Sequence, residues 1–433
     1  MKLVRVGVVL LVSLGILLLI VAGTDRAQLN RSAFDSTNTV RDVDLPNSVV
    51  IPTRIGLAAI LCSALASVVM FGRRLPRRYM LLWLAFLALS VCLAIRGLEW
   101  QDLRSPAIYS SMAPVFVLAS GVLFIGADRR SWTLFRRVAI TIVFAVSILA
   151  MLQVIQLVST NRGEAYGRIS VFAGILEVGC LLPLGTSVER KPLIRLLAWL
   201  PLGALLMCTI AMQARLMVIE VFSLFIAITL LRARASGSLN AVVRNGLVAS
   251  FVIGACVVFI YSGLNLMVAE SVDAFWDRRD ADTRTTQAQN FFQRIEPQDL
   301  ITGIGIPRPG EYNGQGERGI DLGFINILFI GGLPALCLFV PLHIYPAIKC
   351  SKLKLSPQDA PVVAAILTYG IRLFSSTVPN LEPHYIILLI FMGRSAAIAS
   401  GSRHGLRMWT ARSSVFSGLR NPVGQIVSPV PSL

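Results

Sequence analysis

Charged residues are scarce in this sequence. They make up 15% of its 433 residues, whereas hydrophobic residues make up 55% and the mean hydropathy is +0.71. An ordinary soluble domain carries about 25% charged residues, so that class is excluded. Lipid offers no hydrogen-bond partner to the backbone, and each long apolar run must therefore satisfy its own polar groups as a helix. The composition predicts an all-α polytopic membrane protein.

Familiar catalytic and ligand-binding motifs are missing as well. The sequence contains no Walker motif, no HExxH zinc motif and no Ser-His-Asp arrangement. The segment GIGIPRPG at residues 303–310 lacks the GK[ST] ending of a phosphate-binding loop. Only three histidines are present, and the seven cysteines form no CxxC pair or Cys/His cluster. Structural disulfides and a zinc site are therefore not expected.

The net charge of +17 would suggest nucleic-acid binding in a soluble protein. In this chain the basic residues recur in short clusters between apolar runs, and no basic domain exists outside these runs. Positive charge gathers in the cytoplasmic connections of membrane proteins, and this orientation effect accounts for most of it. Nucleic acid is not an expected partner.

Apolar runs of roughly 20 residues are long enough to cross the hydrocarbon core of a membrane as helices. By this criterion the sequence predicts about 12 transmembrane helices. The predicted spans are residues 3–23, 55–72, 79–97, 106–127, 138–158, 169–187, 196–213, 216–231, 245–263, 323–348, 361–378 and 384–400. The first run resembles a signal peptide, but it is long and lacks a convincing cleavage site, so we expect a retained span.

Every second connection between these spans is basic. The basic segments are residues 73–78, 129–137, 189–195, 232–244, 349–354 and the tail after Gly401. Twelve spans place all of them on one side, which the positive-inside rule assigns to the cytoplasm together with both termini. The predicted organisation is a membrane domain over residues 1–401 and a basic, poorly ordered cytoplasmic tail over residues 402–433.

One long polar segment, residues 264–322, lies between the ninth and tenth predicted spans. It is rich in arginine, carboxylates, glycine and proline, and the charge pattern places it on the non-cytoplasmic side. In a bacterial inner membrane that side is the periplasm. Its glycines and prolines predict a shaped loop. A protein that only anchors itself needs no such insertion, so the loop indicates work on a charged substrate at the membrane surface.

Arginines on the outer face oppose the usual topological bias, and they invite a second explanation. A guanidinium can pair with two phosphate oxygens at once, which suits a lipid-linked pyrophosphate. The candidates are Arg168, Arg215 and Arg372 in or near spans, and Arg278, Arg279, Arg284 and Arg318 in the loop. Arg168 and Arg215 could equally reach lipid headgroups from the ends of spans. Arg372 is placed deeper, where a charge is a functional candidate by default.

Asp321 stands where the polar loop enters the tenth predicted span. A carboxylate here can act as a base, and it can equally cap the helix by accepting backbone N–H bonds. Of the three histidines, only His384 is placed on the outer face. Glu177 and Glu220 lie inside spans, where pairing with arginines of neighbouring helices is favoured over catalysis.

The twelve spans and the large outer loop resemble the O-antigen ligase and O-antigen polymerase superfamily. That family places an arginine at the outer start of the eighth span, where Arg215 stands in QARLMVIE. It places another arginine in the loop, upstream of a proline and a Gly-hydrophobic-Gly. Arg284, Pro297 and the segment Gly303-Ile304-Gly305 follow this order.

A third match lies at the start of the tenth span and includes one departure from the family. The family has a histidine, ten intervening residues and a glycine, and Asp321 and Gly332 keep that spacing. Aspartate therefore stands where the family has histidine. Either Asp321 takes the histidine's role, or another residue such as Glu317 or His384 does.

The resemblance implies a bacterial inner-membrane glycosyltransferase. Such enzymes transfer a glycan from a polyprenyl-pyrophosphate donor to a sugar hydroxyl outside the cytoplasm, without a metal, cofactor or nucleotide sugar. It implies that Arg215 and Arg284 neutralise the leaving pyrophosphate and that Asp321 deprotonates or orients the attacking hydroxyl. The implied partners are the lipid-linked oligosaccharide, an acceptor glycan and the bilayer, and a chain-length regulator protein is a candidate.

The first hypothesis is a polymerase that joins undecaprenyl-pyrophosphate-linked repeat units into O-antigen, capsule or exopolysaccharide. A ligase that transfers glycan to a lipid A core is the nearest alternative, and the absence of the family histidine favours the polymerase. A flippase or exporter of lipid-linked glycan is an alternative of another class. It should carry charge through its full depth and show an internal repeat, and no repeat is visible in the sequence.

Overall fold

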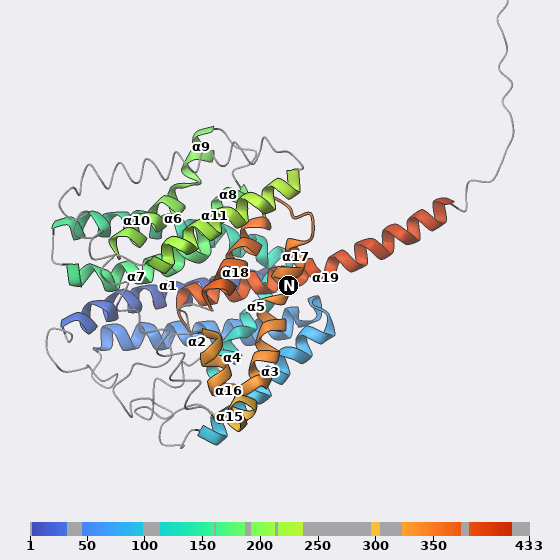
Figure 1. The fold of residues 1–433 in the computed structure, drawn as a ribbon, viewed down its shortest axis with the longest axis horizontal. Coiled ribbons are helices and arrows are strands. Elements are labelled where there is room, and N and C mark those ends of the chain that lie inside the picture. The colour runs from blue at the N-terminus through green and yellow to red at the C-terminus, as the bar shows by residue number, and fades with distance from the viewer. Residues whose placement is uncertain are drawn as a thin grey trace, which may run out of the picture.

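The computed structural model describes residues 2–32, 46–97, 113–159, 162–186, 192–212, 215–236, 296–303, 323–373 and 381–417. Over these residues the chain is helical and contains no strand, as the all-α prediction requires. The helices are α1 (Lys2–Ser32), α2 (Asn47–Phe71), η2 (Gly72–Arg74), α3 (Arg77–Gly97), α4 (Pro114–Ala119), η5 (Ser120–Val122), α5 (Leu123–Ala127), α6 (Arg129–Ser159), α7 (Arg162–Gly179), α8 (Leu182–Thr186), α9 (Pro192–Leu197), α10 (Leu200–Ala211), α11 (Arg215–Ser236), α15 (Pro297–Thr302), α16 (Gly323–His343), α17 (Tyr345–Ser351), α18 (Ala360–Arg372) and α19 (Pro383–Ser417). Figure 1 shows how they pack together.

Six helical segments among the described residues are long and apolar enough to cross a membrane. They are α1, α2, α3, α6, the α16–α17 segment and α19. Shorter apolar helices cover Pro114–Ala127, Ile169–Gly185, Leu200–Thr209, Glu220–Leu231 and Ala360–Arg372. Both sets coincide with predicted spans, whereas the predicted span at 245–263 lies outside the described residues. A helical membrane protein is thus supported, and the number of twelve spans stays a prediction.

Large apolar side chains cover the outside of the helices. Val69 is 80% exposed and Ile95 is 71% exposed, although both lie in segments of high hydropathy. Polar groups turn inward, where Trp83 Nε1 donates to Ser120 Oγ at 3.0 Å. Water would penalise such an exterior by about 25 cal/mol for each Å² of apolar surface, whereas lipid does not. The distribution therefore fits a lipid environment.

Ion pairs join several basic segments at one end of the bundle. Arg5 Nε donates to Asp128 Oδ2 at 3.1 Å, and Arg74 Nε lies 3.7 Å from Asp128 Oδ1. These contacts bring the N-terminus, the first basic connection and the start of α6 together. The sequence predicts that all three lie on one side of the membrane.

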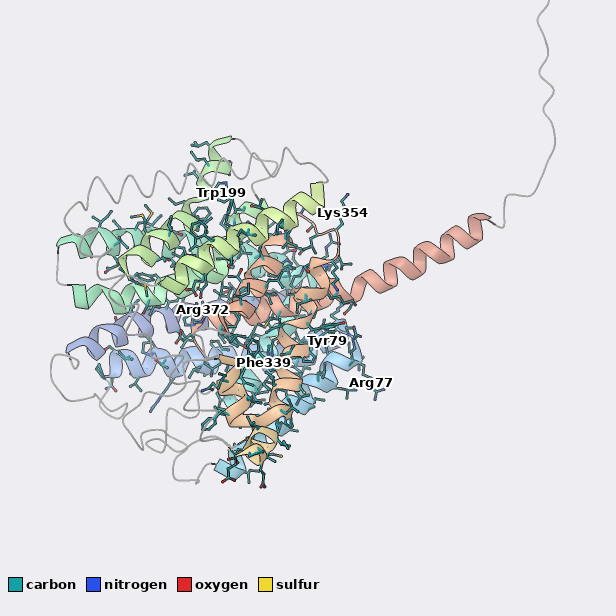
Figure 2. The ribbon with its side chains drawn as sticks, viewed as in Figure 1. Arg77, Tyr79, Trp199, Phe339, Lys354 and Arg372 are labelled. Atoms are coloured by element: carbon teal, nitrogen blue, oxygen red, sulfur yellow. The ribbon has the colours of Figure 1, made fainter. Side chains whose placement is uncertain are left out.

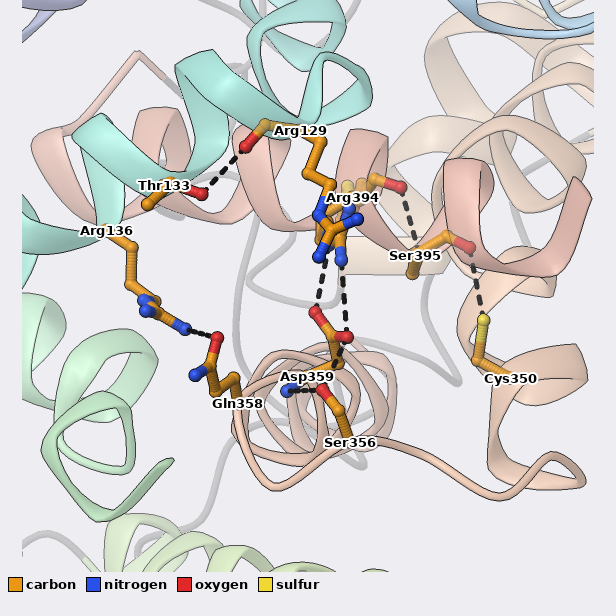
Figure 3. Close-up of polar contacts among 10 residues, drawn as sticks. Arg129, Thr133, Arg136, Cys350, Ser356, Gln358, Asp359, Arg394 and Ser395 are labelled. Atoms are coloured by element: carbon orange, nitrogen blue, oxygen red, sulfur yellow. Dashed lines mark hydrogen bonds and ion pairs between the residues drawn. The ribbon is translucent and has the colours of Figure 1, made fainter. Parts of the chain in front are cut away.

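A second set of polar contacts ties α18 to α19 and α6 (Figure 3). Asp359 Oδ1 accepts a hydrogen bond from Arg394 Nε at 2.9 Å, and Arg136 donates to the side chain of Gln358. Together with the Asp128 contacts, these residues define what we call the basic end of the bundle. Its assignment to the cytoplasm remains a prediction.

The last helix continues beyond the predicted membrane domain. A poorly ordered tail is predicted from residue 402, but α19 extends to Ser417, and Figure 1 shows this part projecting away from the bundle. The next proline is Pro422, so nothing in the sequence breaks the helix earlier by removing a backbone donor. Residues 418–433 lie outside the described residues.

The helix α16 reverses direction at Gly332. The backbone there has φ 65° and ψ −169°, outside the helical region. Along a continuous helix, Phe324 and Phe339 would lie about 22 Å apart. Their ring centroids are instead 6.5 Å apart, so the two halves of α16 form a helical hairpin. In Figure 1 the halves are two orange segments that converge near α15.

Both ends of this hairpin meet the same end of α18. The N–H of Phe324 donates to the carbonyl oxygen of Leu373 at 3.1 Å, and Ile344 Cγ2 lies 3.6 Å from the place of a Cβ on Gly370. A membrane-spanning helix would separate its ends by about 30 Å. The structure therefore differs from the predicted continuous span at 323–348. Composition does not separate the two cases, because both halves are apolar all round.

Candidate functional site

The structure describes part of the predicted site. Side chains are described for Arg372 and His384. Arg168, within α7, and Arg215, the first residue of α11, are described as backbone positions. The remaining predicted residues lie outside the described residues: Asp321, Glu317, Arg278, Arg279, Arg284 and Arg318. The roles assigned to this last group stay predictions.

Arg372 lies inside the bundle as the last residue of α18 (Figure 2). Its guanidinium contacts the carboxylate of Glu177 on α7, and its Nε lies 3.3 Å from Glu220 Oε1 on α11. The side chains of Glu177 and Glu220 are each 7% exposed. The predicted pairing of these carboxylates with an arginine of a neighbouring helix is confirmed. The negative C-terminal end of the α18 dipole also favours a cation at this position.

Two carboxylates change what Arg372 can do. Contacts with two carboxylates occupy donors of the guanidinium that a phosphate would otherwise need. The contacts also link α7, α11 and α18 at one point inside the bundle. This geometry favours a role for Arg372 in holding the helices together over the predicted direct binding of pyrophosphate.

His384 lies near the start of α19 and is linked to the surface by Glu382. His384 Nδ1 lies 3.1 Å from Glu382 Oε2, and the Glu382 side chain is 55% exposed, whereas that of His384 is 9% exposed. The imidazole packs against α7, where a Cβ on Gly174 would lie 3.1 Å from Nδ1. His384 is therefore a buried group with an exposed acidic partner.

Two buried tyrosines connect this pair with Arg372. The rings of Tyr369 on α18 and Tyr385 on α19 have centroids 5.6 Å apart. Tyr369 interacts electrostatically with Glu382 and with Glu220, and Arg372 interacts electrostatically with Glu382. We call the connected set the Arg372 cluster, and its members are Glu177, Glu220, Tyr369, Arg372, Glu382, His384 and Tyr385.

The second feature of the site is a backbone contact between Gly303 and Gly332. Gly303 follows α15 and has φ 71° and ψ 161°, and Gly332 has φ 65° and ψ −169°. This region of backbone conformation is essentially confined to glycine. A Cβ on Gly303 would lie 2.6 Å from the Gly332 nitrogen, and a Cβ on Gly332 would lie 2.6 Å from the Gly303 nitrogen. No other residue fits either position without parting the two segments.

This glycine contact holds α15, which belongs to the polar segment 264–322, against the tip of the hairpin. Pro297 opens α15 at a position where its fixed φ suits a helix start, and the helix ends against Gly332. The residues that carry the family resemblance in this part of the chain, Pro297, Gly303 and Gly332, thus belong to one structural unit. Gly303 lies against the hairpin tip, and Gly323, the next described residue, lies where the hairpin starts.

The sequence gives a signal for some members of the Arg372 cluster and none for others. Tyr369 and Tyr385 lie in apolar runs, where an aromatic residue is usually a core residue, so no signal distinguishes them. Glu382 stands two residues before His384 at the start of an apolar run, and this spacing is the signal from which their pairing could have been predicted. Within the described part of the chain, no group of three or more His, Cys, Asp or Glu side chains could hold a metal ion.

Comparison of the sequence with protein-family models and with curated proteins gives no match in either case. The resemblance drawn from the sequence therefore depends on the order and placement of this chain's own residues.

Proposed function

We propose that the protein is a metal-independent membrane glycosyltransferase that polymerises undecaprenyl-pyrophosphate-linked repeat units at the non-cytoplasmic face of a bacterial inner membrane. The observation that carries the proposal is the contact between Gly303 and Gly332. Both glycines were selected by the family resemblance, from positions far apart in the sequence. A chance match of spacing gives no reason for the two to meet, whereas a shared site does.

The position of the outer arginines also supports the proposal. Gly185, at the end of the α7–α8 segment, packs against residues 357 and 358 at the basic end, so α7 runs toward that end. Arg168 precedes Glu177 on α7, and Arg215 precedes Glu220 near the start of α11. The α18 helix begins at the basic end and finishes at Arg372, beside both glutamates. Arg168 and Arg215 therefore lie on the far side of the Arg372 cluster from the basic end.

The proposed reaction is a displacement at the anomeric carbon of the donor sugar. The acceptor hydroxyl forms the new C–O bond, the bond to the pyrophosphate oxygen breaks, and lipid pyrophosphate leaves. The hydroxyl proton passes to Asp321 or to the residue that takes its place. Arg215 and Arg284, with the other loop arginines, offset the charge of the leaving pyrophosphate.

The distribution of charge along α18 and α19 favours an enzyme over a flippase or exporter. A transport path should carry polar groups through its depth. Between Asp359 and Arg372, α18 has no charged residue, and α19 has none between His384 and Arg394. The charges on these helices gather at two levels, with an apolar interval between them.

Incubation of the purified protein with lipid-linked repeat units separates the possible activities. A ladder of products is the expected result. Transfer only after addition of a lipid A core would instead identify a ligase, and a complete lack of products would contradict a transferase and favour transport.

Alanine at Arg215 or at Arg284 is expected to abolish the ladder, because the leaving pyrophosphate would lose a charge partner. The protein level and the pool of lipid-linked repeat units should stay unchanged. Arg130, exposed at the basic end, provides the control, and Arg130→Ala should leave the ladder intact. A normal length and amount of polymer from both variants would refute the proposed role of these arginines. For Asp321, full activity of Asp321→Asn would remove it as the base.

A further inference from the structure

Glu382 and His384 form a carboxylate–imidazole pair at the end of α19 that is remote from the basic end of the bundle. His384 precedes Arg394 by ten residues, so it lies about 15 Å along the helix from that end. His384 Nδ1 lies 3.1 Å from Glu382 Oε2. A carboxylate accepts hydrogen bonds, so Nδ1 is the nitrogen that carries the hydrogen. In the neutral ring, Nε2 then keeps its lone pair and can accept a proton.

The imidazole of His384 is supported on two sides. Glu382 holds one edge of the ring, and α7 packs against it at Gly174. A Cβ on Gly174 would lie 3.1 Å from Nδ1 and 3.7 Å from Cε1, so a larger residue would press on the ring. A carboxylate that orients an imidazole and stabilises its protonated form is the arrangement in which histidine serves as a general base.

The polar atoms around this pair include acceptors and donors that lack partners. The Nε2 of His384 and the hydroxyls of Tyr369 and Tyr385 are buried and have no hydrogen-bond partner among the described residues. Tyr369 interacts electrostatically with Glu382, and the centroids of the two tyrosine rings are 5.6 Å apart. Buried polar groups are normally satisfied. An unmatched acceptor and two unmatched donors in one region suit a ligand hydroxyl, because a hydroxyl both donates and accepts.

The pair lies close to the surface and close to the end of the long polar segment. The side chain of Glu382 is 55% exposed and the imidazole is 9% exposed, so one side chain separates the ring from the outside. The helix α16 begins directly after the polar segment, and the N–H of Phe324 in its first turn donates to the carbonyl oxygen of Leu373. Leu373 follows Arg372, which interacts electrostatically with Glu382. The segment thus enters the bundle beside the Arg372 cluster.

We propose that His384, held by Glu382, is the general base that takes the proton of the acceptor sugar hydroxyl. The proton passes to Nε2 while the hydroxyl oxygen bonds to the anomeric carbon, and lipid pyrophosphate leaves with the electron pair of the broken C–O bond. Glu382 stabilises the imidazolium, which loses its proton to water after the product has left. This inference rests on the proposed glycan transfer and assigns the base to α19 instead of to Asp321.

Solid-state NMR of the full chain in lipid bilayers, with ¹⁵N-labelled histidine, tests the pair itself. At alkaline pH the signal of His384 should show a protonated Nδ1 and an unprotonated Nε2, and its absence from His384→Gln identifies it. Glu382→Ala removes the acceptor of the Nδ1 hydrogen bond and should shift the Nδ1 resonance. A protonated Nε2 in the unmodified protein, or an unshifted resonance in Glu382→Ala, would overturn the proposal.

The rate of polymer formation from purified lipid-linked repeat units tests the base. His384→Gln keeps a side-chain N–H that can donate to Glu382 but has no basic nitrogen, so the maximal rate should fall by about 10²- to 10⁴-fold. Glu382→Ala should also lower the maximal rate with little change in KM, and this substitution is at a half-exposed position, which favours correct folding. His404→Ala, in the part of α19 that projects from the bundle (Figure 1), is the matched control and should leave the rate unchanged.

The outcomes separate this inference from the function on which it rests. A complete lack of products from the unmodified protein overturns the proposed function and the base with it. Equal rates in the unmodified protein and in His384→Gln overturn the base alone. A slow His384→Gln variant beside an unimpaired Glu382→Ala variant would show that the pair does not act as a unit, and it would also overturn the proposal.

Discussion

Alanine at Gly332 is expected to release α15 from the tip of the α16 hairpin. The substitution adds a single methyl group, but that group would sit 2.6 Å from the Gly303 nitrogen and closer still to the Ile301 carbonyl oxygen. These are backbone atoms, which a rotamer change does not move. The two segments must therefore part, or the backbone at Gly332 must leave its present conformation.

The size of the effect follows from the backbone conformation. A non-glycine residue held in this region costs about 1–3 kcal/mol, before any overlap of the methyl group is counted. That range corresponds to about a 5- to 150-fold shift in the equilibrium between docked and released α15. Gly303→Ala should give an effect of similar size, because it disturbs the same contact from the other side.

Hydrogen exchange of the reconstituted protein measures this shift directly. The N–H of Gly303 donates to the carbonyl oxygen of Asp299 at 2.7 Å, so its exchange reports whether α15 is formed and docked. We expect exchange to accelerate by about the factor given above in either variant. Exchange in the double variant should be little faster than in either single variant, because both changes break the same contact.

A matched control is available in α1. A Cβ on Gly7 would meet no atom within 4 Å, so Gly7→Ala should leave exchange in α15 unchanged. Unaltered exchange over residues 299–303 in Gly332→Ala would refute the reasoning. If α15 is released but polymer formation continues at its normal rate, the contact exists and its proposed link to the transferase site is wrong.

Two further predictions concern the helical scaffold. Cysteines at Ile325 and Leu338, in a background without native cysteines, should form a cross-link, because a continuous helix would hold them about 20 Å apart and the hairpin brings them together. Lack of a cross-link under oxidising conditions would contradict the hairpin. Arg394→Ala should lower the melting temperature of the purified protein more than Arg130→Ala does, because it leaves Asp359 without its ion-pair partner at a cost of up to about 3–5 kcal/mol. Equal melting temperatures would contradict this role of the pair.

Much of the helical architecture could be predicted because each apolar run decides its own structure. In lipid, a run such as α1 or α6 has no alternative to internal hydrogen bonds, so hydropathy locates it without any knowledge of its neighbours. The charge pattern also predicted that the first basic connection and the start of α6 lie on the same side of the membrane. The contacts of Asp128 join these two segments.

The α16 hairpin shows where this local reasoning stops. A span and a pair of half-helices have the same composition, and Gly332 by itself indicates only a weak point in a helix. The reversal becomes visible through contacts between residues far apart in the sequence, such as that between Phe324 and Phe339. No pattern in the sequence contains such a contact.

The candidate site divides in the same way. The sequence alone determined that this chain is a helical protein with several runs apolar enough for a membrane, and that residues 264–322 form one long polar segment. These conclusions follow from composition and hydropathy, which are local properties of the chain, whereas the order of Gly303 and Gly332 was an expectation from the resemblance.

Only the tertiary structure decided what the key residues touch. It put Gly303 against Gly332, and it placed Arg372 between Glu177 and Glu220 instead of leaving it open to a phosphate. The physical reason is that the charge of a site depends on which helices pack together. Packing brings residues from distant parts of the chain into one low-dielectric place, where each charge must find a partner or a proton.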